Sequence, residues 1–202
     1  MSSRTRALIA ALIVIAGTPV AAQIGFSPAF GFLKAVRERD GTAAMAATQP
    51  GSTVINSRDP ANGDGALHIL TRGRDLTWLG FMLGRGARPD LQNNGGATAL
   101  LLAAQIGWME GAERLLASRA NPNVPNNQGE TPLIYAVRRF DAPMVRLLMA
   151  NRADPNQTDS LSGNSALDYA RQDRRGQPLI PILENRAPRP AQVQGPPAPR
   201  QP

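Results

Sequence analysis

The stretch TPLIYAV at residues 131–137 shows how this chain begins a helix. Thr131 is suited to the N-cap, because its hydroxyl can accept a hydrogen bond from a backbone N–H of the first turn. Pro132 then falls at the first helical position, where a missing N–H costs nothing. The next apolar residues follow the i, i+3, i+4 spacing of a single helix face: Leu133, Ala136 and Val137. The stretch therefore predicts a short helix that buries one side.

The same pattern recurs along the chain with a period of 33 or 34 residues. The leucine of the motif stands at regularly spaced places: Leu33, Leu67, Leu100, Leu133 and Leu167. A second anchor, a short stretch containing proline, recurs in step at residues 86–90, 119–123 and 152–156. A period of this length indicates stacked helix–turn–helix units, none of which can bury its apolar face alone.

These motifs resemble those of the ankyrin repeat family. Residues 131–136 match the family's TPLHxA motif, with Ile134 in place of the histidine, and residues 115–123 and 148–156 match its LLxxGADxN motif. The resemblance covers residues 30–184 and implies an all-α ankyrin-repeat solenoid with hairpin-like turns between repeats. It implies about five helix–turn–helix units with degenerate terminal caps, in a domain over residues 30–186, with these approximate ranges: 30–59, 60–93, 94–126, 127–159 and 160–186.

Three features depart from the family pattern. Gly65 replaces the capping threonine of the second unit, which should weaken that helix start. Phe140 stands where the family usually has a glycine between two helices, and a bulky residue held in the left-handed conformation costs on the order of 1 kcal/mol. The second helix of the first unit, expected near residues 43–48, is rich in alanine and should bury less apolar area than its counterparts.

The two ends of the chain have compositions of their own. Arg4 and Arg6 precede an apolar run, Ala7 to Ala22, which predicts a signal peptide over residues 1–22 cleaved after Ala22. A retained membrane anchor is the alternative, but a run of 16 residues is shorter than a spanning helix needs. Residues 23–29 are then an N-terminal extension, and the proline-rich residues 187–202 are predicted to form a disordered tail. We therefore expect a periplasmic or secreted protein.

The excess positive charge lies mostly outside the repeats. The net charge is +7, but five arginines flank the repeat region: Arg4, Arg6, Arg186, Arg189 and Arg200. Between Leu33 and Glu184 there are 17 basic and 15 acidic residues, a net charge of only +2. Because nucleic-acid binding relies on a broad basic surface, this distribution argues against a nucleic-acid partner.

The residue types that carry most catalysis are scarce. There is no cysteine and only one histidine, His68, which excludes disulfides, thiolate sites and multi-histidine metal sites. His68 occupies the histidine position of the TPLHxA motif, where the resemblance implies a structural hydrogen bond to a neighbouring turn. No phosphate-binding loop, dinucleotide fingerprint or hydrolase motif occurs. We therefore expect no catalytic, cofactor-binding or metal-binding residues, and no enzyme activity.

The resemblance implies that a partner protein binds the concave surface made by the turns and the first helices. By repeat register, the expected partner-binding residues are Arg72, Gln105, Ile106, Asn127, Gln128, Arg138, Arg139 and Gln172. Arginine forks suit carboxylates, so the arginines suggest an acidic or polar partner segment, with an ordinary solvated face as the alternative. Trp78 and Trp108 each begin a second helix; Trp108 is expected to be partly exposed, and packing between repeats is the alternative for both.

Together these features predict a non-catalytic protein–protein interaction module, a monomer without a membrane span once the signal is removed. It looks like the small periplasmic ankyrin proteins of Gram-negative bacteria. Two alternatives stay open at this point. One is a stress-protective or holdase-like accessory to another periplasmic enzyme, and the other is a secreted effector that acts in a host or competitor cell.

Overall fold

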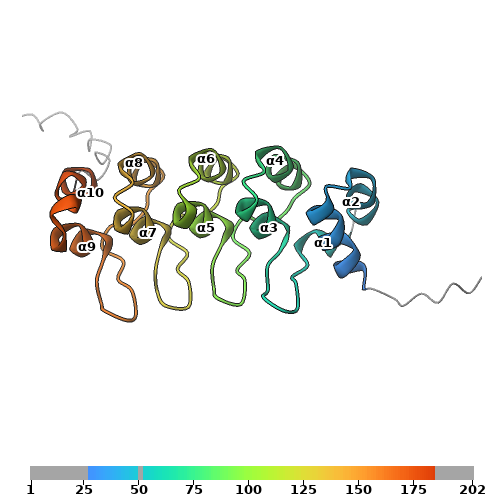
Figure 1. Ribbon diagram of the computed structural model, residues 1–202, viewed down its shortest axis with the longest axis horizontal. Helices are drawn as coiled ribbons and strands as arrows, with labels where there is room; N and C mark the ends of the chain where they lie inside the picture. The colour runs from blue at the N-terminus through green and yellow to red at the C-terminus, as the bar shows by residue number, and fades with distance from the viewer. Residues whose placement is uncertain (1–26, 50–51, 185–202) are drawn as a thin grey trace, which may run out of the picture.

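Pairs of short helices stack side by side into one elongated array (Figure 1). The computed structural model describes residues 27–49 and 52–184, so the predicted signal peptide, residues 23–26 of the extension and the proline-rich tail lie outside the described residues. The inner layer consists of α1 (Pro28–Glu38), α3 (Ala66–Arg72), α5 (Ala99–Ile106), α7 (Pro132–Arg138) and α9 (Ala166–Gln172). The outer layer consists of α2 (Gly41–Ala47), α4 (Leu76–Gly84), α6 (Met109–Ala117), α8 (Ala142–Ala150) and α10 (Ile180–Glu184).

Long turns project from the inner layer on the side away from the outer layer (Figure 1). They connect each outer helix to the next inner helix, as the hairpin-like turns of the predicted solenoid require. Among the described residues, strand-like pairing is limited to an isolated antiparallel bridge between Thr158 and Ser165. The predicted all-helical repeat fold is therefore confirmed.

Side-chain caps set where the helices begin. Thr131 accepts a hydrogen bond from the backbone N–H of Ile134 at 3.3 Å, and Pro132 follows it as the first helical residue, as predicted. Thr98 and Ser165 cap α5 and α9 in the same way. Three outer helices are instead capped by aspartates: Asp40, Asp75 and Asp141. Because these caps satisfy N–H groups that have no partner inside the helix, they fix each helix start locally.

The start of α3 lacks a capping hydroxyl, because Gly65 is its N-cap. The His68 ring binds a different group at this helix start: its Nδ1 accepts a hydrogen bond from the N–H of Gly65 itself at 3.1 Å. Its Nε2 lies 2.8 Å from the carbonyl oxygen of Ala97, in the next repeat. Since a carbonyl only accepts, Nε2 carries the proton and the ring is neutral. Burial lowers the pKa of His68, which agrees with this neutral state.

Left-handed residues join the inner helices to the outer ones. Gly107 ends α5 with φ of +65°, and Phe140 takes the equivalent conformation after α7, with φ of +56°, as its place in the repeat predicts. The Phe140 ring is covered by the guanidinium of Arg175, which lies 4.3 Å from the ring centroid. A cation–π contact of this kind contributes about 0.5–1 kcal/mol at an exposed site, enough to offset part of the backbone strain.

The terminal units deviate from the central ones. α1 begins at Pro28, with Ser27 as its N-cap, so the first repeat starts two residues before the predicted boundary at residue 30. Its partner α2 buries only Ala44, in agreement with the expected weak packing of this alanine-rich helix. In the last unit, a 3₁₀ segment, η2 (Arg174–Leu179), and the short α10 replace a regular second helix.

Trp108 is buried, with only 5% of its surface exposed, so the prediction that it is partly exposed was wrong. The reason is Gly111, one turn further along α6: a Cβ built there would lie 2.0 Å from the indole ring. The ring therefore packs directly on the helix backbone, which the position of Trp108 at a helix start does not reveal. Trp78 is half-buried and meets Phe81 edge-on, with 5.8 Å between the ring centroids.

Candidate functional site

The projecting turns are fastened to one another by backbone hydrogen bonds. The N–H groups of Asn94, Asn127 and Ser160 each donate to a carbonyl of the preceding turn, at 3.0, 3.0 and 2.7 Å. Asn127 adds a side-chain bond from Nδ2 to the carbonyl of Asn94 at 2.9 Å. The predicted contact residue Asn127 thus supports the scaffold. Gln128 forms hydrogen bonds through its backbone N–H and carbonyl, and its side chain is exposed. The turns form a continuous surface whose shape is set before any partner arrives.

A row of exposed side chains runs across the inner layer, one from the end of each of four helices. Its members are Arg72 on α3, Gln105 on α5, Arg138 on α7 and Gln172 on α9. We call these four residues the inner row. The equal spacing that predicted them places them in register, because each repeat contributes the same position of its first helix.

The two arginines of the inner row are already paired within their own repeats. Arg72 Nε lies 3.1 Å from Asp64 Oδ2, and Arg138 Nη1 lies 2.6 Å from Glu130 Oε1. The side chains of the two carboxylates are only 5% and 13% exposed, whereas those of the arginines are 53% and 49% exposed. Each guanidinium is therefore held over a buried carboxylate, with its remaining N–H groups facing solvent. These arginines are not the free cations that a strongly acidic partner would need.

The other predicted residues lie beside the inner row, at the junction of the two layers. The guanidinium of Arg139 lies over Gly107, where an added Cβ would be 2.8 Å from its Nη2. Arg139 forms no salt bridge with any described residue. Ile106 is half-buried, and its carbonyl accepts a hydrogen bond from Arg74 Nη2 at 2.7 Å. Arg139 is thus available to a partner, whereas Ile106 serves mainly to join two repeats.

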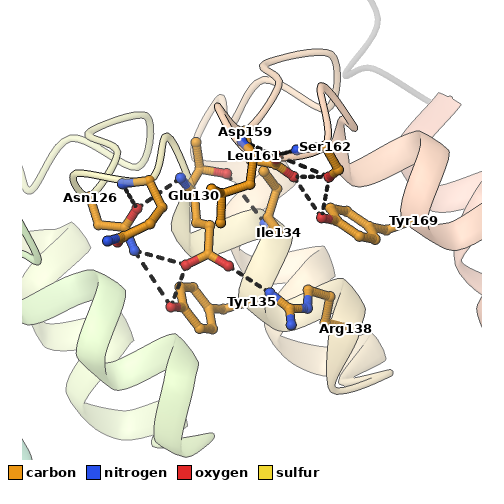
Figure 2. Close-up of polar contacts among 11 residues, drawn as sticks. Asn126, Glu130, Ile134, Tyr135, Arg138, Asp159, Leu161, Ser162 and Tyr169 are labelled. Carbon is orange, nitrogen blue, oxygen red and sulfur yellow. Dashed lines mark hydrogen bonds and ion pairs between the residues drawn. The ribbon is translucent and has the colours of Figure 1, made fainter.

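A polar cluster on α7 holds Arg138 in place (Figure 2). The carboxylate of Glu130 accepts hydrogen bonds from Tyr135 Oη at 2.6 Å, from Asn126 Nδ2 at 2.9 Å and from Arg138. Burial and the Glu130 carboxylate raise the pKa of Tyr135 to about 12, so the phenol stays protonated and acts as a donor. The ring of Tyr135 also packs on Leu101 and Leu102 of the preceding repeat.

A second cluster lies in the last turn and faces the first (Figure 2). Asp159 accepts hydrogen bonds from Tyr169 Oη at 2.6 Å and from the backbone N–H of Ser162 at 2.6 Å. Burial opposes ionisation of Asp159, but the hydrogen bonds from Tyr169 and Ser162 outweigh it and lower the pKa of Asp159 to about 2. The Arg138 guanidinium lies 5.6 Å from the centroid of the Tyr169 ring and so joins the two clusters.

An open cavity of about 330 Å³ lies between the ends of α7 and α9. Its walls include two members of the inner row, Arg138 and Gln172, together with residues that sequence reasoning did not select: Phe140, Tyr169 and Arg175. Arg175 is held by both oxygens of Asp173, at 3.2 and 2.8 Å. Apart from Arg138 and Gln172, the sequence signal near this cavity was the left-handed position expected of Phe140. Its pairing with Arg175 depends on η2, which the repeat pattern does not predict.

The described residues offer fixed donors and aromatic faces for binding. His68 is 1% exposed and has both ring nitrogens engaged, so it faces no cavity where it could act as a base. Within residues 27–49 and 52–184, no three acidic or histidine side chains gather as metal ligands would. None of the helices in that part of the chain is long and apolar enough to cross a membrane.

Repeated helix pairs with stacked turns and an exposed inner row define a helical repeat solenoid, a class built around an extended binding surface. Residues 67–159 match the family model described as ankyrin repeats in three copies, so this part of the chain consists of ankyrin repeats. The match extends from α3 to the turn after α8, and the degenerate units at both ends continue the same stacking. Ankyrin repeats generally mediate protein–protein interactions and are typically non-catalytic.

Proposed function

We propose that this protein is a non-catalytic binding module that holds a partner protein on the inner row and the neighbouring turns. The observation that carries the proposal is the fixing of the exposed guanidinium of Arg138 by Glu130 and by the ring of Tyr169. A side chain that is already ordered loses little conformational entropy when a partner binds, so its hydrogen bonds contribute more to affinity.

The salt bridges of the inner row limit the chemical groups that a partner segment needs to present. Asp64 and Glu130 balance the charges of Arg72 and Arg138, so a dense cluster of acidic residues is not required opposite them. Hydrogen-bond acceptors such as backbone carbonyls, amides or a single carboxylate suit the remaining N–H groups and the unpaired Arg139. The partner segment is therefore polar and carries at most a few acidic residues.

The double substitution Arg138→Gln/Arg139→Gln tests this proposal. Glutamine already occupies the inner row at positions 105 and 172, so the array should tolerate it there. We expect the affinity for a partner recovered by affinity capture to fall at least about tenfold, as for a central arginine of an interface, when binding is measured by calorimetry. Arg119→Gln/Arg146→Gln, which removes two exposed charges elsewhere, is the control and should bind normally. If many proteins are captured weakly, and both double variants capture the same proteins as the wild type, the result would instead support a holdase-like accessory.

We also propose that the protein acts outside the cytoplasm, with residues 1–22 removed as a signal peptide. The arginines at positions 4 and 6, the apolar run and the small residues before Gln23 support this location. N-terminal sequencing of the protein from periplasmic and culture-medium fractions should give Gln23 as the first residue. An intact Met1 in the membrane fraction would indicate a retained anchor, and abundance in the medium would favour the effector role.

A further inference from the structure

A groove crosses the outer layer, on the side of the array opposite the projecting turns. One end is an apolar cavity of about 240 Å³ between α2 and α4, lined by Met45, Trp78 and Phe81 among others. It shares Thr77 and Phe81 with a larger cavity of about 790 Å³, which extends over α4 to α6. We call these two joined cavities the outer groove.

The apolar end of the outer groove exists because α2 is short and rich in alanine. Its small side chains leave the Trp78 and Phe81 rings of α4 only half-buried, and these rings pack edge to face. Met45 and Leu76 line the groove and are 47% and 44% exposed, among the most exposed large apolar side chains described. Contiguous apolar surface of this kind on a soluble protein commonly marks a binding surface.

The other end of the outer groove is acidic. Glu110 and Glu113 lie exposed on α6, and neither forms a salt bridge with a described residue. Arg114 lies in the same wall, with its guanidinium over the backbone of Gly80. An aromatic, apolar floor beside free carboxylates suits a proline-rich segment that carries arginine, because the proline rings pack on aromatic side chains and the guanidinium pairs with a carboxylate.

We propose that the outer groove binds the proline-rich C-terminal segment of the same chain, residues 187–202. This segment contains six prolines, two arginines and no acidic residue, so its chemistry complements both ends of the groove. The order of its residues also agrees. From α10, a chain following the outer layer meets the acidic α6 before the aromatic α4 (Figure 1). Arg189 likewise precedes the prolines at positions 196, 197 and 199.

The segment is long enough to reach the groove. α10, α8, α6 and α4 follow one another in the outer layer, and packed helices lie about 8–10 Å apart, so α4 is about 30 Å from the end of α10 (Figure 1). An extended proline-rich chain advances about 3.1 Å per residue, so about ten residues cover this distance. The residues that remain are the ones that carry the proline cluster, which would lie over Trp78 and Phe81.

Disulfide trapping in the full-length chain tests the proposal, because the protein has no cysteine of its own. Ala198→Cys is combined either with Thr77→Cys in the outer groove or with Arg146→Cys, an exposed position on α8. α8 is closer to the origin of the segment, so an unbound segment would react at least as fast with Arg146→Cys. If the segment occupies the groove, Thr77→Cys should form the intramolecular disulfide faster, on the order of tenfold, because binding raises the effective concentration there.

A charge exchange tests which contacts guide the segment. Glu110→Lys/Glu113→Lys should abolish the advantage of Thr77→Cys, and adding Arg189→Glu should restore it. Circular dichroism of each variant checks that the array is folded. The proposal would be overturned if Arg146→Cys reacted as fast as Thr77→Cys or faster, or if disulfide-linked dimers formed in place of intramolecular bonds. Disulfide rates that do not change with the charge exchange would also overturn it.

Discussion

Replacing Gly111 with alanine should destabilise the protein by about 3 kcal/mol or more, at the upper end of what overpacking a core costs. The added Cβ would lie 2.0–2.4 Å from three carbon atoms of the Trp108 indole. The indole is 5% exposed and belongs to the main core cluster, so it cannot move without opening the contact between α6 and its neighbours. Urea denaturation followed by tryptophan fluorescence would measure the loss, and the emission of Trp108 should shift to longer wavelength.

Gly31→Ala is the matched control for this prediction. Gly31 also lies inside a helix, α1, but a Cβ there meets no atom within 4 Å. Because alanine is the better helix former, this substitution should stabilise the protein by about 1 kcal/mol. If the Gly111→Ala and Gly31→Ala proteins were equally stable, the burial of Trp108 would not depend on the absence of a side chain at position 111.

Replacing His68 with leucine should cost about 1–3 kcal/mol, although leucine and isoleucine occupy the same motif position at 101 and 134. In those repeats Thr98 and Thr131 cap the helix with their own hydroxyls. In α3 there is no capping hydroxyl, and the imidazole instead accepts from the N–H of the cap residue Gly65 and binds the carbonyl of Ala97. Leucine would leave the buried N–H of Gly65 without a partner and would remove one of the two hydrogen bonds to the Ala97 carbonyl, which also accepts from the N–H of Asn93 at 3.0 Å. Its better apolar burial would recover only part of the loss. Chemical denaturation at pH 8 would measure the difference.

The same residue should make stability depend on pH. Burial lowers the pKa of His68 below its ordinary value of 6.5; the carboxylate of Asp64 favours the charged ring, whereas Arg72 and Arg58 disfavour it. The unfolded chain therefore binds the proton more readily than the folded chain. The contribution of His68 is complete above about pH 6.5 and is lost as the pH falls through the lower pKa of the folded state. Between pH 8 and 5, the wild-type protein should lose more stability than the His68→Leu protein, and parallel profiles would contradict the assignment.

The repeat architecture could be predicted from sequence because its causes are local. The position of Thr131 and Pro132, the apolar spacing after them and the recurrence of the leucines act within single helices and turns. For the same reason Phe140 and the missing capping hydroxyl at Gly65 were recognisable as departures from the repeat pattern. The register of the inner row follows from the period alone, so its four members occupy the same position of successive inner helices: Arg72, Gln105, Arg138 and Gln172.

The tertiary structure decided which of these side chains have a salt-bridge partner and which side chains are exposed. Arg72 and Arg138 are held by Asp64 and Glu130 because each turn folds back over its own inner helix. The repeat period does not reveal how far each carboxylate lies from its arginine. Trp108 is buried because one glycine leaves space for its ring, and the outer groove is open because α2 is too small to cover its neighbour. The sequence by itself determined the repeating unit, since caps and apolar spacing act over a few residues. Only the stacking of the units determined charge pairing and exposure, since both depend on side chains that meet across turns and between neighbouring helices.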